Sequence, residues 1–129
     1  MINRRLIVAG MALSAFLTFA AKAADKKPFD QAAFDAAQAQ GKPVLVEVSA
    51  SWCPVCKVQA PILSKLRTDP RFKDLISFDI DFDSQKDLLR KFNVSKQSTL
   101  IVFKGKQEVG RSTGDTDPSS IESLLAKAI

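Results

Sequence analysis

Residues 43–57 read PVLVEVSASWCPVCK and hold both cysteines of the chain. The first eight of these residues are dense in β-branched and apolar side chains, which is typical of a strand buried on both faces of a sheet. Pro54 follows the first cysteine, Cys53, and its fixed φ and missing N–H suit the first position of a helix. The stretch therefore predicts a central strand that leads into a helix, with Cys53 at the helix N-terminus and Cys56 one turn inside it.

The segments on either side alternate between helix and strand signals. Residues 27–42 carry apolar side chains at helical spacing, with Asp30 placed to cap the helix and Gly41 to end it. From Pro54 onward, the sequence predicts a helix over 54–67, with Val58, Ile62 and Leu66 on its apolar face, and then a strand over 75–82. A helix over 84–94, capped by Ser84, follows. The sequence then predicts a hairpin with strands at 99–103 and 107–112, and a closing helix with Asp117 as its N-cap. This order predicts an α/β fold in which helices cover both faces of a central mixed sheet.

The first 23 residues have the three-part organisation of a secretory signal peptide. The chain begins with MINRR, continues without a charge from residue 6 to residue 21, and reaches Ala21-Lys22-Ala23, which fits an A-x-A cleavage site. The apolar run is shorter than the roughly 20 residues that a transmembrane helix needs. We therefore expect residues 1–23 to be cleaved and residues 24–129 to form one exported domain, with an uncleaved anchor as the alternative.

The charge pattern does not favour nucleic acid as a partner. The chain has a formal net charge of +5, to which Arg4, Arg5 and Lys22 of the expected leader contribute. The remaining charges of both signs are mixed along the sequence, and no basic run alternates with aromatic residues. We therefore expect no nucleic-acid binding.

A structural disulfide and a metal site are two possible roles for the cysteines. A bond between Cys53 and Cys56 closes a very short loop, so it constrains the unfolded chain far less than the ~3 kcal/mol expected for a loop of about 15 residues. A metal site normally needs four protein ligands, or three and a water, but the chain has two cysteines and no histidine. A metal or cluster site would thus need four thiolates shared by two chains, and we expect no metal in the monomer.

A reactive dithiol is the third role, and the position at a helix N-terminus favours it. The free N–H groups and the helix dipole stabilise a thiolate there, so the pKa of Cys53 should fall below the ordinary value of about 8.5. Cys56 lies on the inner side of the same turn and is expected to be more buried and more protonated. The pair therefore offers an attacking sulfur at Cys53 and a resolving sulfur at Cys56.

The same motifs resemble the thioredoxin superfamily. The resemblance covers nearly all of residues 29–129 and rests on VLVEVSASWCPVCK with Pro61 eight residues after Cys53, on LLRKFNV, on TLIVFKGKQEVGRSTG and on the terminal helix. The stretches GKPVLVEVSASWCPVCK, DPRF and TLIVF…GRSTG are most similar to the periplasmic thioredoxin-like C-terminal domain of the membrane reductase DsbD. The resemblance implies a thioredoxin fold, thiol–disulfide exchange without a cofactor, and a location in the periplasm.

The resemblance also implies a mechanism for the residues around the pair. Cys53 would attack a substrate disulfide, and Cys56 would resolve the mixed disulfide. Glu47 occupies the place of the family's buried aspartate, where burial would raise its pKa and let it take the proton from Cys56. The alternative for Glu47 is an ordinary ion pair, with Lys57 or Lys96 as its partner.

Substrate contacts are implied on both sides of the cysteines. Trp52, Pro54 and Val55 would form one part of the docking surface, and Gln97 and Ser98 would form the other. Ser98 stands where the family has a cis-proline, and a cis bond without proline costs ~3 kcal/mol. We therefore predict a trans Gln97–Ser98 peptide, a rearranged loop and a narrower range of substrates.

The residues between the cysteines favour a moderate to reducing potential, because Pro54 and Val55 bring neither a charge nor a donor side chain. We therefore expect a monomeric, exported thiol–disulfide oxidoreductase that reduces protein disulfides and receives electrons from a membrane donor of the DsbD type. The alternative from another class is a non-catalytic thioredoxin-like module that binds a client protein or a shared metal cluster.

Overall fold

The computed structural model describes residues 22–129. The predicted signal peptide, residues 1–23, thus lies outside the described residues except for Lys22 and Ala23. Ala23 packs against the rest of the domain: it is 3% exposed, and its N–H donates to the Arg67 carbonyl at 3.0 Å. None of the helices within residues 22–129 is long and apolar enough to cross a membrane.

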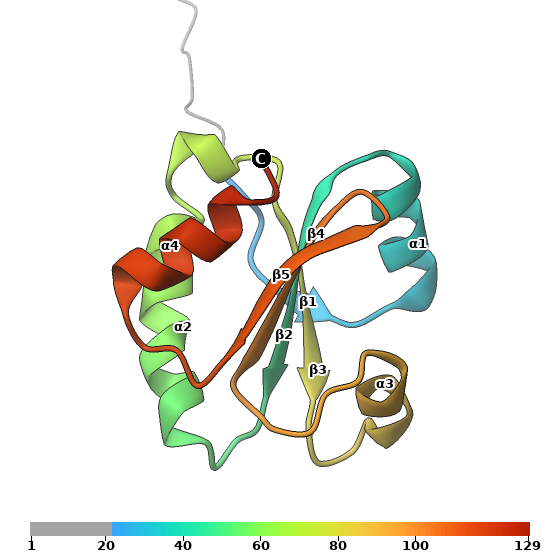
Figure 1. Cartoon of the computed structure of the whole chain (residues 1–129), viewed down its shortest axis with the longest axis vertical. Coiled ribbons are helices and arrows are strands. Elements are labelled where there is room, and N and C mark those ends of the chain that lie inside the picture. Colours follow the sequence, from blue (N-terminus) through green and yellow to red (C-terminus); the bar gives the residue numbers. More distant parts are fainter. Residues whose placement is uncertain (1–21) are drawn as a thin grey trace, which may run out of the picture.

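A five-stranded mixed sheet forms the centre of the molecule, with the strand order β1-β3-β2-β4-β5 (Figure 1). The strands are β1 (Lys27–Pro28), β2 (Pro43–Ser49), β3 (Ile76–Asp81), β4 (Thr99–Lys104) and β5 (Gln107–Thr113). The central strand β2 pairs in parallel with β3 and antiparallel with β4, and the β4–β5 hairpin completes the antiparallel part. The predicted α/β class and mixed sheet are confirmed, whereas the two-residue edge strand β1 was not predicted.

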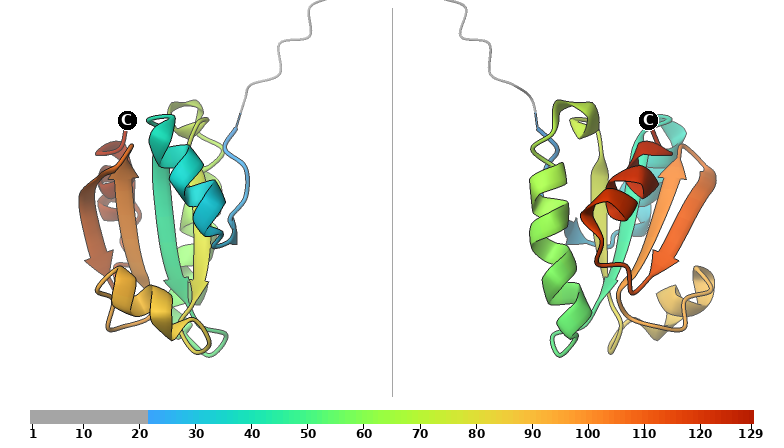
Figure 2. Two further views of the ribbon diagram at one scale, coloured as in Figure 1. Left: turned by 90° about the vertical axis from the view of Figure 1, so that its right-hand side faces the viewer. Right: turned by 60° about the vertical axis from the view of Figure 1, so that its left-hand side comes forward.

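Helices cover both faces of this sheet, as Figure 2 shows from two sides. The helices are α1 (Gln31–Ala39), α2 (Pro54–Leu66), α3 (Lys86–Lys91) and α4 (Pro118–Ala126), and a 3-10 turn spans Pro70–Phe72. Helices α2 and α4 lie on one face, and α1 and α3 lie on the other (Figures 1 and 2). The sheet is therefore the middle layer of three, and β2, with Val44 to Val48 buried, runs through its centre.

Two hydrophobic clusters fill the spaces between these layers. The cluster beneath α1 and α3 is rich in phenylalanine, and the Phe34 ring meets Phe78, Phe92 and Phe103 edge to face. The cluster beneath α2 and α4 is aliphatic and includes Leu45, Leu63, Leu100, Val102, Ile121 and Leu125. Burying each of these large side chains contributes about 1.5–3 kcal/mol relative to exposure. Side chains on both faces of β2 belong to these clusters, so packing on both sides holds this strand in place.

The helix ends follow the local signals in most places. Asp30 caps α1 by accepting from the Ala32 and Ala33 N–H groups at 2.9 and 3.4 Å, and Gly41 takes the left-handed φ of +70° that ends the helix turn. Asp117 caps α4 as predicted.

The predicted cap at Ser84 is wrong, because its hydroxyl donates to the Asp81 carboxylate at 2.6 Å. Gln85 takes the cap position without a capping side-chain bond, so α3 is shorter than the predicted 84–94 segment.

Candidate active site

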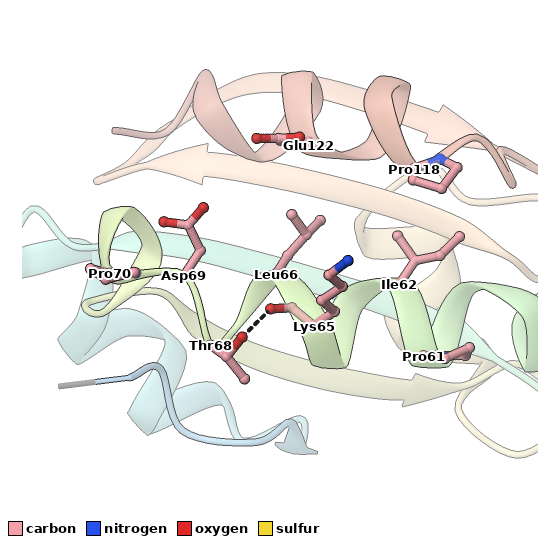
Figure 3. A pocket seen from close by; sticks show the side chains of 9 residues that line it. All are labelled: Pro61, Ile62, Lys65, Leu66, Thr68, Asp69, Pro70, Pro118 and Glu122. Carbon is pink, nitrogen blue, oxygen red and sulfur yellow. Dashed lines mark hydrogen bonds between the residues drawn. The ribbon is translucent and has the colours of Figure 1, made fainter. Parts of the chain in front are cut away.

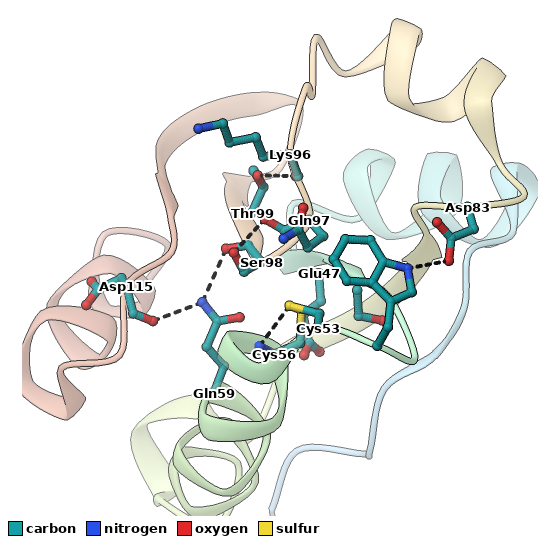
Figure 4. Close-up of a disulfide and its surroundings, with 12 residues drawn as sticks. Glu47, Cys53, Cys56, Gln59, Asp83, Lys96, Gln97, Ser98, Thr99 and Asp115 are labelled. Atoms are coloured by element: carbon teal, nitrogen blue, oxygen red, sulfur yellow. Dashed lines mark hydrogen bonds between the residues drawn. A yellow bond between two sulfur atoms is a disulfide. The ribbon is translucent and has the colours of Figure 1, made fainter.

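Cys53 and Cys56 lie where the central strand gives way to α2. β2 ends at Ser49, and Cys53 is the N-cap of α2 with extended backbone angles (φ −83°, ψ 109°). The two sulfurs are joined in a disulfide, with 5.3 Å between the Cα atoms. The Cys53 sulfur also accepts the N–H of Cys56 at 3.1 Å (Figure 4). The pair predicted from the sequence is thus assembled at the predicted strand–helix junction.

The environment of the Cys53 sulfur is suited to a negative charge. Its sulfur takes the place of a capping oxygen, because the N–H groups of the first helical turn have no partners within the helix. The positive end of the helix dipole adds to the same effect. When the disulfide is reduced, this geometry stabilises the Cys53 thiolate over the thiol, which is the form that attacks disulfides.

The exposure of the two cysteines differs from the prediction. Cys53 is 0% exposed, whereas Cys56 is half-buried. The expectation that Cys56 is the more buried residue is therefore wrong for the disulfide form. Cys53 belongs to the tight connection after β2, where its N–H donates to the Ala50 carbonyl at 3.1 Å, while Cys56 lies on a helical turn whose neighbour Lys57 is exposed.

Glu47 lies in the middle of β2 as a buried acid, 5% exposed. Its Oε2 accepts from the Arg67 guanidinium at 2.5 Å, and its Oε1 is 4.0 Å from the Lys26 ammonium. The Arg67 Nε also donates to the Ser77 hydroxyl at 3.3 Å. Glu47 therefore forms an ion pair, which confirms this part of the alternative predicted for it.

The predicted cations of that ion pair, Lys57 and Lys96, were wrong, because the cations within 4.0 Å of the Glu47 carboxylate are Arg67 and Lys26. Arg67 instead reaches Glu47 from the C-terminal end of α2. One signal in the sequence could have indicated it: Gln59, Leu63 and Arg67 are spaced four apart, and these three form the buried stripe of the helix. Val58, which was predicted on the apolar face, is 48% exposed.

Two opposing effects act on the Glu47 carboxyl. Burial raises the pKa of Glu47 above its ordinary value, since the charged form loses solvation, and the nearby Asp79 carboxylate acts in the same direction. Arg67 and Lys26 lower the pKa and offset part of this rise. The net effect is a raised pKa, so the proton equilibrium of this carboxyl lies closer to neutral pH than that of an exposed glutamate.

The predicted docking residues around the cysteines lie at the surface. Trp52 is 52% exposed, and its indole N–H donates to the Asp83 carboxylate at 2.8 Å. Pro54 is exposed and Val55 is half-buried. A substrate protein can therefore reach these side chains, and their role in docking stays a prediction.

The loop that contains Gln97 and Ser98 has an unusual backbone conformation. The Gln97–Ser98 peptide is trans, as predicted, and Ser98 has a left-handed φ of +59°. Such a conformation costs a residue with a side chain on the order of 1–3 kcal/mol. Neighbouring groups hold it: the Ser98 N–H donates to Val48 at 2.8 Å, and the Ser98 hydroxyl donates to the Gln97 carbonyl at 2.5 Å.

Sequence reasoning missed Gln59, whose side chain is 3% exposed. Its Nε2 donates to the carbonyl oxygens of Ser98 at 3.2 Å and Asp115 at 2.9 Å (Figure 4). Within residues 22–129, no group of three or more His, Cys, Asp and Glu side chains is placed to hold a metal ion.

A separate hollow of about 660 Å³ lies between α2, the 3-10 turn and α4 (Figure 3). Its lining residues are Pro61, Ile62, Lys65, Leu66, Thr68, Asp69, Pro70, Pro118 and Glu122. Both cysteines lie at the opposite, N-terminal end of α2. The hollow is therefore not part of the disulfide site.

Comparison with known proteins agrees with this geometry. The Thioredoxin family model matches residues 25–127, which is most of the chain. The chain belongs to the thioredoxin family. It is 35% identical over 97 residues to thioredoxin-2 of Saccharomyces cerevisiae, which covers 74% of this chain and 90% of the yeast protein. It is also 42% identical over 73 residues to the thioredoxin of Mycobacterium bovis, which covers 57% of this chain and 62% of that protein.

Solved structures of relatives lead to the same conclusion. The crystal structure of Trxlp from Edwardsiella tarda EIB202 is similar with a TM-score of 0.76 and 50% identity, over 78% of this chain and 98% of that chain. This thioredoxin-family protein is a thiol–disulfide oxidoreductase with a close Cys53–Cys56 pair. The predicted thioredoxin fold and enzyme class are confirmed, whereas the finer likeness to the DsbD domain stays a prediction.

Proposed function

We propose that this protein is an exported reductase of protein disulfides that works in the periplasm and is recharged by a membrane donor of the DsbD type. The observation that supports exchange chemistry most directly is the Cys53 sulfur, which accepts the Cys56 N–H at 3.1 Å at the N-terminus of α2. The reducing direction is favoured by Pro54 and Val55, which place neither a charge nor a donor side chain between the sulfurs.

Reduction of a substrate proceeds in two exchanges. The Cys53 thiolate attacks one sulfur of the substrate disulfide, so the substrate S–S bond breaks and its other sulfur leaves as a thiolate. Cys56 then loses its proton and attacks the Cys53 sulfur of the mixed disulfide. This step joins Cys53 to Cys56 and releases the second substrate sulfur. Two electrons pass from the cysteine pair to the substrate, and the substrate thiolates take up protons according to the pH.

Glu47 is our candidate for the group that takes the proton from Cys56. Its raised pKa brings the carboxyl closer to the range in which it exchanges protons near neutral pH. Arg67 engages Oε2, while Oε1 makes no hydrogen bond within the described part of the chain. The second oxygen is thus available to receive a proton, directly or through a water molecule.

The proposed export rests on the leader sequence. Residues 1–23 combine a basic start, an uncharged apolar run and an A-x-A site. In the folded domain the Ala23 N–H is bonded to the Arg67 carbonyl and the residue is 3% exposed, so a peptidase has poor access to the bond that follows it. We therefore infer that the leader is removed before the domain folds. Intact-mass analysis of protein from the periplasmic fraction should give a chain that starts at Ala24.

The equilibrium potential of the Cys53–Cys56 pair tests the proposed direction. Protein equilibrated with mixtures of reduced and oxidised glutathione is trapped with an alkylating agent, and the reduced fraction is counted by mass. A potential near or below that of the glutathione pool supports a reductase, because the pair then passes electrons to substrates. A strongly oxidising potential would contradict the proposal, and unprocessed protein confined to the cytoplasm would contradict the proposed location.

The proposed donor is tested by the redox state of the protein in cells. Alkylation of whole cells should show mostly reduced Cys53 and Cys56 when a DsbD-type membrane reductase is present. The pair should become oxidised when that reductase is deleted. An unchanged redox state in the deletion strain would argue against this donor and leave the exchange chemistry intact.

A further inference from the structure

Gln59 connects the helix that carries Cys56 to two loops that are distant in the sequence. It follows Cys56 by three residues on α2. Its buried amide donates to the carbonyl oxygens of Ser98 and Asp115, from the loops before β4 and after β5 (Figure 4). A buried amide group is costly without its hydrogen bonds, so these two contacts fix the positions of both loops relative to α2.

The Ser98 loop is also tied to the strand that precedes the cysteines. The Ser98 N–H donates to the Val48 carbonyl at the end of β2, and its own carbonyl accepts a second bond from the Gly114 N–H at 3.0 Å. The left-handed backbone of Ser98 is not intrinsically favoured, so its conformation depends on these neighbours. The loop is thus held between the strand before Cys53 and the helix after it, with Gln59 as the side chain that supplies the helix contact.

We propose that Gln59 is a positioning residue for protein substrates: it fixes the buried Ser98 and the half-buried Asp115 backbone, and through Ser98 it sets the place of the half-buried Gln97, which a substrate chain contacts. Ser98 is a serine in a trans peptide, so the loop lacks the rigidity of a proline ring and needs an external tether. Gln59 provides that tether from the inside of the molecule. The exchange chemistry of the sulfurs does not use Gln59.

If Gln59 has this role, its loss should affect small disulfide substrates and protein disulfide substrates differently. A small disulfide needs only access to the Cys53 sulfur, whereas a protein disulfide also rests its backbone on the surrounding loops. Loss of the tether should therefore weaken the binding of protein substrates and leave the sulfur chemistry unchanged. Binding that is lost equally in the ground state and the transition state raises KM without lowering kcat.

Gln59→Met is the first test, because methionine has a similar length but no hydrogen-bond donor. We expect a roughly tenfold rise in KM for reduction of insulin, which corresponds to about 1.4 kcal/mol. The kcat for insulin, the rate with 5,5′-dithiobis(2-nitrobenzoate) and the equilibrium potential of the cysteine pair should change less than about twofold. Gln107→Leu, an exposed glutamine at the start of β5, is the matched control and should behave as the wild type.

Gln59→Glu gives a second readout that a purely structural role would not produce. The introduced carboxyl is buried beside two carbonyl oxygens, and it can donate a hydrogen bond only when protonated. The ratio of insulin activity to small-disulfide activity should fall as pH rises in this variant and stay flat in the wild type. If Gln59→Met does not fold, the fall of this ratio with rising pH in Gln59→Glu decides the question.

Two results would overturn the assignment. The first is an equal loss of activity with insulin and with the small disulfide, which would make Gln59 part of the exchange chemistry. The second is a lower melting temperature with an unchanged KM for insulin and a flat ratio in Gln59→Glu, which would make it a packing residue. Neither result would affect the proposed reducing direction, which the potential of the wild-type pair tests separately.

Discussion

Arg67→Met removes the cation from the buried ion pair behind the active site. Arg67 is 5% exposed, donates to Glu47 at 2.5 Å and also contacts the Ser77 hydroxyl. Removing one partner of a buried pair typically costs about 3–5 kcal/mol, because the other charge stays buried without compensation. Lys26, 4.0 Å from the second Glu47 oxygen, supplies part of that compensation, so we expect a loss of about 3 kcal/mol near neutral pH.

The loss should depend on pH through Glu47. Burial raises the pKa of the Glu47 carboxyl, and Arg67 opposes this rise. In folded Arg67→Met, the pKa of Glu47 should therefore lie further above its value in the unfolded chain than it does in the wild type. A group with a raised folded pKa contributes stability that is present below the unfolded pKa and is lost as pH rises through the folded pKa. The stability deficit of Arg67→Met should therefore be smallest below the unfolded pKa of about 4.3 and should grow toward neutral pH.

Urea denaturation followed by circular dichroism at several pH values measures both effects. The matched control is the double variant Glu47→Gln/Arg67→Met, which removes the buried charge together with its partner and should recover most of the lost stability at neutral pH. A deficit in Arg67→Met that is the same at all pH values would refute this reasoning. So would a double variant that is less stable than the single one at neutral pH.

Three further predictions concern the site and a helix end. Cys53→Ser should abolish insulin reduction, and Cys56→Ser should accumulate mixed disulfides visible by mass spectrometry; full turnover in Cys53→Ser would exclude the mechanism. Glu47→Gln should slow the resolving step at neutral pH, measured as slower decay of the mixed disulfide in single-turnover experiments, and an unchanged decay rate would remove its proposed role. Asp30→Ala should cost about 1 kcal/mol in thermal unfolding because it removes the α1 cap, whereas the exposed Asp35→Ala is the control with little effect.

Local signals accounted for most of the fold. The β2 strand, the start of α2 at Pro54 and the caps at Asp30 and Asp117 depend on neighbouring residues, so they can be read from short stretches. Ser84 shows the limit of this reasoning: a serine before a helix can bond either to the helix N–H groups or to a nearby carboxylate, and here it binds Asp81. The choice depends on a turn that the sequence does not specify.

The polar interior of the site could not be predicted in the same way. The sequence placed Val58 on the buried face of α2, yet this residue is 48% exposed and the buried face carries Gln59 and Arg67. A polar side chain is buried when it finds partners, and the partners here are Glu47 and the Ser98 and Asp115 carbonyls, from other parts of the chain. Cysteine positions follow from local sequence, whereas the groups that tune and frame them are set by contacts across the fold.

The position of Trp52 should make the intrinsic fluorescence of the protein report the redox state of its cysteines. Trp52 is the only tryptophan of the chain and directly precedes Cys53, and the chain has no tyrosine. An adjacent disulfide quenches indole emission by accepting an electron from the excited ring, whereas a pair of thiols does so less effectively. Because the Asp83 carboxylate accepts from the indole N–H at 2.8 Å, the ring of this residue next to Cys53 in the sequence has a defined position. The intrinsic fluorescence of the protein should therefore increase on reduction, so that the transfer of electrons from a partner protein can be followed in real time without a dye.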